Sequence, residues 1–151
     1  MKKTGVVAII GRPNAGKSTL LNNLLGHKVS ITSPKPQTTR FSIQAVYEDD
    51  RGQIIFVDTP GMMGKVRNPL ARRINLEAGI QINKELDLVI YLVDHTRERA
   101  VEENQAFGLV RKFKGSKILV INKIDVIRPS HIVQYKFMEE EFLLLATIIV
   151  I

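Results

Sequence analysis

An eight-residue stretch near the start of the chain, GRPNAGKS at residues 11–18, fits the pattern G-x-x-x-x-G-K-[S/T] in full. A β-rich apolar run at residues 6–10 precedes it, and leucines at helical spacing follow it over residues 17–25. Its glycines allow backbone N–H groups to approach phosphate oxygens closely, and the dipole of the following helix favours negative charge. The stretch therefore predicts a phosphate-binding loop, and the alternative is a glycine-rich surface turn.

The chemistry of this loop assigns roles to individual side chains. We expect Lys17 to reach the β- and γ-phosphates of a nucleotide, and so to act in catalysis, and Ser18 to offer its hydroxyl to Mg²⁺. A lysine that begins an otherwise apolar helix face has no packing purpose, which favours this interpretation. The residues expected to bind the nucleotide here are Asn14, Ala15, Gly16, Lys17, Ser18 and Thr19.

Strand-like and helix-like segments alternate along the chain, which predicts an α/β fold with a mostly parallel sheet and helices on both faces. Two adjacent strand segments joined by a short turn predict a hairpin that adds one antiparallel edge strand. Together these features are typical of the three-layer sandwich of P-loop NTPases. The strands are expected at residues 6–10, 41–48, 53–57, 86–93, 117–121 and 147–151, and the helices at 17–25, 70–84, 98–114 and 130–145.

Composition limits the classes of function. The 151 residues suit one domain, and the absence of cysteine excludes disulfides, zinc fingers and thiol catalysis and fits a reducing, cytoplasmic location. The net charge of +7 indicates either a solvated basic surface or contact with nucleic acid or ribosome. The apolar residues 142–151 are too few to cross a membrane as a helix, so we expect no transmembrane segment.

Two further motifs follow strand segments. Asp58 and Gly61, in DTPG at residues 58–61, are placed to hold Mg²⁺ through water and to meet the γ-phosphate through a backbone N–H. Asn122, Lys123 and Asp125, in NKID at residues 122–125, are expected to bind the base.

The base motif selects guanine over adenine. The Asp125 carboxylate can accept hydrogen bonds from N1–H and the 2-amino group of guanine, whereas adenine would leave the charge unpaired. Asn122 would brace the loops, and the stem of Lys123 would lie along the base plane. Each motif alone is weak, because a strand-end turn explains it equally well. All three in order, each after its own strand, predict a GTP- and GDP-binding domain.

With these motifs the chain resembles the TrmE–Era–EngA-like P-loop GTPases, and in particular the Era-type group, over about residues 4–126. Residues 28–40, KVSITSPKPQTTR, are similar to the first switch of that group. The resemblance implies that Thr39 is the switch threonine that reaches Mg²⁺ and serves catalysis, with Thr38 as the second candidate. It also implies that Asn14 helps to position phosphates or a monovalent cation such as K⁺.

Met62 follows the glycine of the second motif, where Ras-like enzymes carry a water-orienting glutamine. The Era-type group also carries an apolar residue here, so the resemblance implies slow intrinsic hydrolysis. Arg40, Lys65 and Arg67 are candidate charge stabilisers, although solvated loop charges explain them equally well.

The resemblance also implies partners and a boundary. Era-type chains continue into an S-A-[K/L]-type base motif and a KH domain that binds 16S ribosomal RNA, whereas residues 1–151 stop before both, so we expect a truncated GTP-binding domain. A full-length form would act in assembly of the 30S ribosomal subunit, and weak or peripheral membrane association is a further expectation. The alternative function is a non-catalytic guanine-nucleotide-binding interaction module or an inactive fragment.

Overall fold

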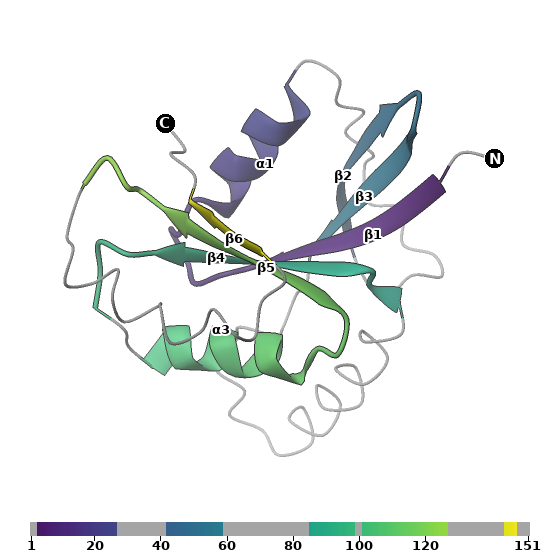
Figure 1. Ribbon diagram of the computed structural model, residues 1–151. Helices are drawn as coiled ribbons and strands as arrows, with labels where there is room; N and C mark the ends of the chain where they lie inside the picture. Colours follow the sequence, from purple (N-terminus) through teal and green to yellow (C-terminus); the bar gives the residue numbers. More distant parts are fainter. Residues whose placement is uncertain (1–2, 27–41, 59–84, 99–100, 127–143, 148–151) are drawn as a thin grey trace.

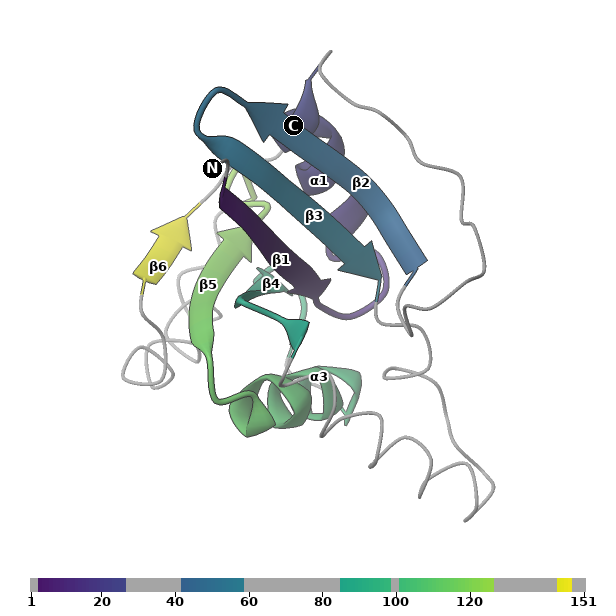
Figure 2. The same ribbon diagram turned by 90° about the vertical axis from the view of Figure 1, so that its right-hand side faces the viewer.

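The computed structural model describes residues 3–26, 42–58, 85–98, 101–126 and 144–147. These residues form a six-stranded sheet in the order β2-β3-β1-β4-β5-β6, with one described helix packed against each face (Figures 1 and 2). The strands are β1 (Lys3–Ile10), β2 (Ser42–Asp49), β3 (Gly52–Asp58), β4 (Leu88–Asp94), β5 (Ser116–Asn122) and β6 (Leu144–Thr147), and the helices are α1 (Lys17–Leu25) and α3 (Val101–Lys112).

Strand β1 is the point where the strand order reverses: β2 and β3 lie on one side of it, and β4, β5 and β6 lie on the other. Strand β3 pairs in parallel with one side of β1 and β4 pairs in parallel with the other side, while β2 pairs antiparallel with β3 at the edge. In open α/β sheets, ligands bind beyond the carboxyl ends of the strands at such a switch point. The loop that follows β1 starts at this position.

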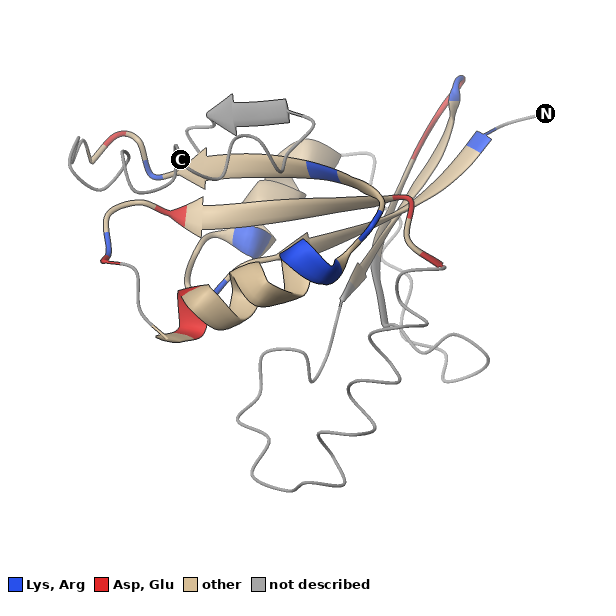
Figure 3. Ribbon diagram, turned by 60° about the horizontal axis from the view of Figure 1, so that its bottom comes forward, with Lys and Arg blue, Asp and Glu red and all other residues tan. Residues whose placement is uncertain are grey.

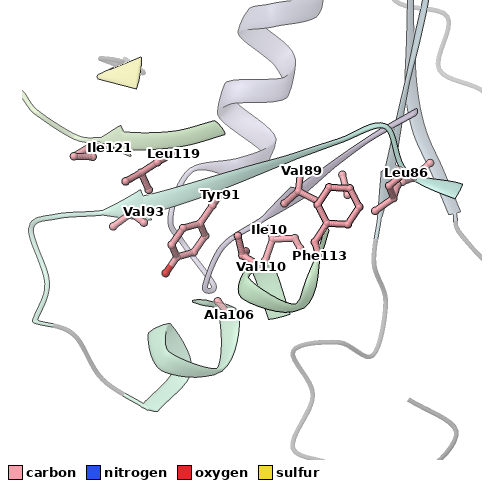
Figure 4. Packing of buried hydrophobic residues seen from close by; sticks show 12 residues of the cluster. Ile10, Leu86, Val89, Tyr91, Val93, Ala106, Val110, Phe113, Leu119 and Ile121 are labelled. Atoms are coloured by element: carbon pink, nitrogen blue, oxygen red, sulfur yellow. The ribbon is translucent and has the colours of Figure 1, made fainter. Parts of the chain in front are cut away.

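Alternate residues of β1 face opposite sides of the sheet and join two separate cores. Ala8 and Ile10 pack toward α3, in a cluster that also holds Tyr91, Val110 and Phe113 (Figure 4). On the other face, Val7 and Ile9 pack with leucines of α1. The sheet is therefore covered on both sides, as buried parallel strands require.

Helix α3 carries charges that suit its direction. Glu102 and Glu103 lie in its first turn, and Arg111 and Lys112 lie in its last turn (Figure 3). Acidic groups at the start and basic groups at the end are favourable with the helix dipole. Glu103 differs from the others because it is fully buried.

The structure confirms the predicted α/β fold and its antiparallel edge strand, but it corrects the end of the chain. A helix was expected to run to residue 145 and a strand over 147–151, whereas β6 covers Leu144–Thr147 and pairs in parallel with β5. Residues 142–151 are apolar except for Thr147, and such a run has no period that separates helix from strand, so pairing with β5 decides the start of the strand. The helix expected at residues 70–84 lies outside the described residues.

None of the helices in the described part of the chain has the length and apolar character that crossing a membrane requires.

Helix α1 allows a matched test of the core. Leu20 is 2% exposed and Leu24 is 47% exposed on the same helix, although both belong to its leucine repeat. We expect Leu20→Ala to lower the free energy of unfolding by about 3 kcal/mol, because it removes buried methyl groups and leaves a cavity. Leu24→Ala should change it by less than about 1 kcal/mol. Urea unfolding followed by circular dichroism measures both, and equal losses would contradict this packing.

Candidate functional site

The phosphate loop, the first residue of the second motif, the base motif and one further segment lie at the carboxyl ends of the parallel strands. The phosphate loop follows β1, Asp58 ends β3, Asp94 ends β4 and Asn122 ends β5. These four strands are parallel to one another, so their carboxyl ends lie on the same side. The topology thus brings together segments that are more than a hundred residues apart in sequence.

The phosphate loop presents cationic and hydroxyl groups at the start of α1. The Lys17 ammonium is half-buried and donates to the backbone oxygens of Gly11 and Arg12 at 2.7 and 3.0 Å. Ser18 and Thr19 are exposed in the first turn, which holds no acidic residue and has no side-chain cap. A helix end of this kind attracts anions.

The backbone of this loop needs glycine at two close contacts. A Cβ on Gly11 would lie 2.4 Å from the backbone oxygen of Leu92, which packs the loop directly on β4. Gly16 has a φ of 99°, and a Cβ there would lie 2.3 Å from the side-chain nitrogen of Asn122. Asn14, with a φ of 63°, is also left-handed, so the loop bends more tightly than ordinary residues allow.

The base motif is joined directly to the phosphate loop, as the sequence predicted. Buried Asn122 donates its side-chain amide to the backbone oxygen of Ala15 at 2.8 Å, and its side-chain oxygen accepts from the Lys123 N–H. Lys123 has a φ of 61°, and the turn closes where Val126 N–H donates to the Lys123 oxygen at 3.1 Å. Asp125 is exposed in this turn.

Asp94 orients the lysine of the base motif. Its carboxylate is fully buried and lies 2.8 Å from the Lys123 ammonium, while its other oxygen accepts from the Thr96 N–H and hydroxyl at 3.0 and 2.6 Å. Burial alone would raise the pKa of Asp94, but the hydrogen bonds from Lys123 and Thr96 outweigh it and lower the pKa below 3.8. The carboxylate is therefore charged at neutral pH.

Arg12 ties the phosphate loop to the segment after β4. Although it belongs to the loop motif, its side chain is 2% exposed, and it donates to the backbone oxygens of Asp94 and Glu98 at 2.8 and 3.1 Å. Its Nε lies 3.1 Å from a carboxylate oxygen of Glu103, as an ion pair without the direction of a hydrogen bond. The other oxygen of Glu103 accepts from the Tyr91 hydroxyl. Arg12 is thus a buried structural residue, and its guanidinium contacts backbone oxygens and the Glu103 carboxylate.

Several predicted residues lie outside what the structure describes. Thr39, Gly61 and Met62 belong to undescribed segments, as do Arg40, Lys65 and Arg67. Asp58 is placed as the last residue of β3, but its side chain is not described. Their predicted roles stay predictions.

The described groups suit a nucleotide with its metal ion. A half-buried ammonium and an uncapped helix end offer positive charge to phosphate, and the Ser18 hydroxyl is exposed where Mg²⁺ on a phosphate needs an oxygen ligand. The exposed Asp125 carboxylate lies on the turn that Asn122 ties to the phosphate loop.

Arg12, Asp94 and Glu103 support the site but were not identified from the sequence. Arg12 occupies a variable position of its motif, and Asp94 follows a strand without any motif around it. Asp94 did carry one signal, because an aspartate at the carboxyl end of a buried strand was the same argument that selected Asp58.

Comparison with known proteins places these features in a family. Residues 6–123 match the family described as 50S ribosome-binding GTPase. GTPase Era of Clostridioides difficile is 46% identical over 125 residues, which cover 83% of this chain and 41% of that protein. GTPase Era of Borreliella burgdorferi is 44% identical over 82% of this chain and 42% of its own length.

Solved structures agree with these sequence matches. A variant of Era from Aquifex aeolicus, bound to GDP and AlF4⁻, is 38% identical with a TM-score of 0.68 and matches 99% of this chain and 52% of its own. Era in complex with MgGDPNP and nucleotides 1506–1542 of 16S ribosomal RNA is 36% identical, with a TM-score of 0.69 and the same coverage. The chain spans about two fifths of the length of these curated relatives and about half of these solved chains.

Replacement of Asp94 tests its contact with Lys123. We expect Asp94→Asn to lower the free energy of unfolding by about 2 kcal/mol at pH 7, because it removes the buried negative charge that pairs with the Lys123 ammonium. Since the folded pKa is lowered, the stabilisation is complete above the ordinary value of 3.8 and is lost as the pH falls through the lowered value. The two proteins should therefore differ less and less in free energy of unfolding as the pH is lowered from 7, and the difference should approach zero in acid. Denaturant titration at each pH measures it. A difference that stays constant with pH would contradict the ion pair.

Proposed function

The chain belongs to the family of 50S ribosome-binding GTPases, and from that premise we propose that it binds GTP with Mg²⁺ and hydrolyses it slowly as a molecular switch. The observation that carries this proposal is the 2.8 Å hydrogen bond between Asn122 and Ala15. It holds the base motif against the phosphate loop, so that one nucleotide can contact both.

The proposed roles follow the charges of the site. Lys17 binds the β- and γ-phosphates once its ammonium exchanges backbone oxygens for phosphate oxygens. Ser18 ligates Mg²⁺, together with Asp58 through water and Thr39 of the first switch. The backbone N–H of Gly61 contacts the γ-phosphate, and Asn14 contributes to a K⁺ site beside the phosphates.

Guanine specificity rests on Asp125. Two carboxylate oxygens accept from N1–H and the 2-amino group of guanine, and the Lys123 stem lies along the base. GTP would order residues 34–40 and 61–67 onto its γ-phosphate, and hydrolysis would release them. Met62 cannot orient water, so the intrinsic rate should not exceed the rate on the order of 10⁻⁴ s⁻¹ of Ras, which has the water-orienting glutamine.

The partner proposed for a full-length form is the small ribosomal subunit. Support comes from the relative solved with nucleotides of 16S ribosomal RNA and from the formal net charge of +7. The proposed location of such a form is the cytoplasm, and weak or peripheral membrane association is part of the same proposal.

Base specificity provides the direct test. The purified chain with Mg²⁺ should bind GDP at least about 100-fold more tightly than ADP, because ADP lacks the donor pair for Asp125. In Asp125→Asn, GDP affinity should fall by roughly 100-fold and XDP affinity should rise, since an amide matches the N1–H and 2-oxo group of xanthine. Isothermal titration calorimetry measures each affinity.

Asp50→Asn is the matched control, because it makes the same change of charge at an exposed residue of the β2–β3 turn. It should leave the affinities for GDP and ADP unchanged. Equal binding of ADP and GDP by the unaltered chain would overturn the proposed function.

A second candidate function, a non-catalytic guanine-nucleotide-binding module, is favoured by Met62. Single-turnover assays with GTP separate the two, because a switch releases phosphate over hours and a binding module does not. We expect phosphate release above that of Lys17→Ala, in which the ammonium is removed from the phosphate loop. Release no faster than in Lys17→Ala, with GTP still bound to the unaltered chain, would establish the binding module.

A further inference from the structure

We propose that His95 is a positioning residue for guanine recognition. Its side chain contacts both ends of the turn that carries Asp125. The inference rests on the proposed function and deepens it. His95 directly follows β4 and is fully buried, and no sequence motif includes it.

The imidazole ring spans two backbone oxygens of the base turn. Its Nδ1 lies 2.8 Å from the Asn122 oxygen, and its Nε2 lies 2.9 Å from the Val126 oxygen. Asn122 begins the turn and Val126 follows Asp125, so a single rigid ring sets the separation between the two ends.

The geometry of the ring suits this position. Its two nitrogens lie on different sides of one planar ring, and each is within hydrogen-bond distance of a backbone oxygen of the turn. A carbonyl oxygen can only accept, so a ring N–H is the group that can bond to it. An apolar side chain of similar size offers no such group.

The end of the turn depends on such bonds more than its start does. Ile124 packs against the hydrophobic cluster on the α3 face, whereas Val126 is 46% exposed and Asp125 is exposed, so side-chain packing after Ile124 is slight. Lys123 has a left-handed φ of 61°, which a long side chain seldom adopts without support. The Asp94 carboxylate lies 2.8 Å from the Lys123 ammonium. His95, the next residue, contacts the backbone oxygens on either side of Lys123, those of Asn122 and Val126.

The consequence for function is the position of the Asp125 carboxylate. Guanine needs both carboxylate oxygens in line with N1–H and the 2-amino group, so a small shift of the turn weakens one bond or both. The phosphate loop also has an anchor that does not involve the base turn, through the hydrogen bonds of Arg12 to the backbone oxygens of Asp94 and Glu98. Loss of His95 should therefore reduce base recognition and leave phosphate binding intact.

The test compares His95→Leu, which keeps an apolar side chain of similar size without donors, with His95→Gln, which keeps one donor group. Affinities of the whole chain with Mg²⁺ are measured for GDP, for ADP, for IDP and for tripolyphosphate. IDP lacks the 2-amino group, and tripolyphosphate contacts only the phosphate loop. Val110→Ala is the control, because it removes core volume on α3, in the cluster on the α3 face of the sheet.

We expect His95→Leu to weaken GDP binding about tenfold and to reduce the preference for GDP over IDP, with His95→Gln between it and the unaltered chain. Tripolyphosphate affinity should stay within about twofold in both variants. Val110→Ala should lower the melting temperature and leave the GDP-to-IDP preference unchanged.

Three other results would contradict the proposal, and each points to a different cause. An unaltered chain that does not prefer GDP to ADP would refute the proposed function itself. An unaltered chain that does, with the GDP-to-IDP preference intact in His95→Leu, would refute only the role of His95. Parallel loss of GDP and tripolyphosphate would show that His95 holds the fold and not the base turn. If His95→Leu does not fold, His95→Gln is judged by the same ratios.

Discussion

A single hydrogen bond, from the Asn122 amide to the Ala15 backbone oxygen, makes one site out of two motifs that lie 107 residues apart. It requires the phosphate loop to bend inward and Gly16 to lack a side chain, because a Cβ there would overlap the Asn122 nitrogen. It also requires β1 and β5 to end on the same side of the sheet, with β4 between them. The parallel topology and the loop conformation are thus both conditions of this contact.

The end of β4 and the segment that follows it contact both the phosphate loop and the base motif through buried residues. Backbone oxygens of this stretch accept from Arg12 of the phosphate loop, the Asp94 carboxylate holds Lys123, and the His95 ring lies against the base turn. The Arg12–Glu103 pair extends this layer into α3. A buried ion pair contributes little net stability compared with apolar packing, but it disfavours other arrangements of the loop. These contacts fix the position of the phosphate loop relative to the base motif.

Much of the fold and part of the site could be predicted from local pattern. The strands were found because short apolar runs end at motif residues such as Gly11 and Asn122, which mark the boundary between sheet and loop. The prediction for the end of the chain was wrong for the opposite reason. Residues 142–151 carry no such marker, and pairing with β5 decides that a strand starts at Leu144, within the helix that was expected to reach residue 145. Leu24 belongs to the leucine repeat of α1, yet it is half-exposed because the packing of the helix decides which leucines face the sheet.

The sequence by itself determined the α/β class and the positions of the phosphate loop and the base motif, and it predicts a preference for guanine through Asp125. These follow from residue types at short spacing, where covalent geometry and hydrogen-bond chemistry suffice. Only the tertiary structure decided that Arg12 is buried against Glu103, that Asp94 holds Lys123 and that His95 lies between Asn122 and Val126. Those contacts join residues from 27 to 91 positions apart, and no local pattern records which distant partner will satisfy a buried charge or a carbonyl oxygen.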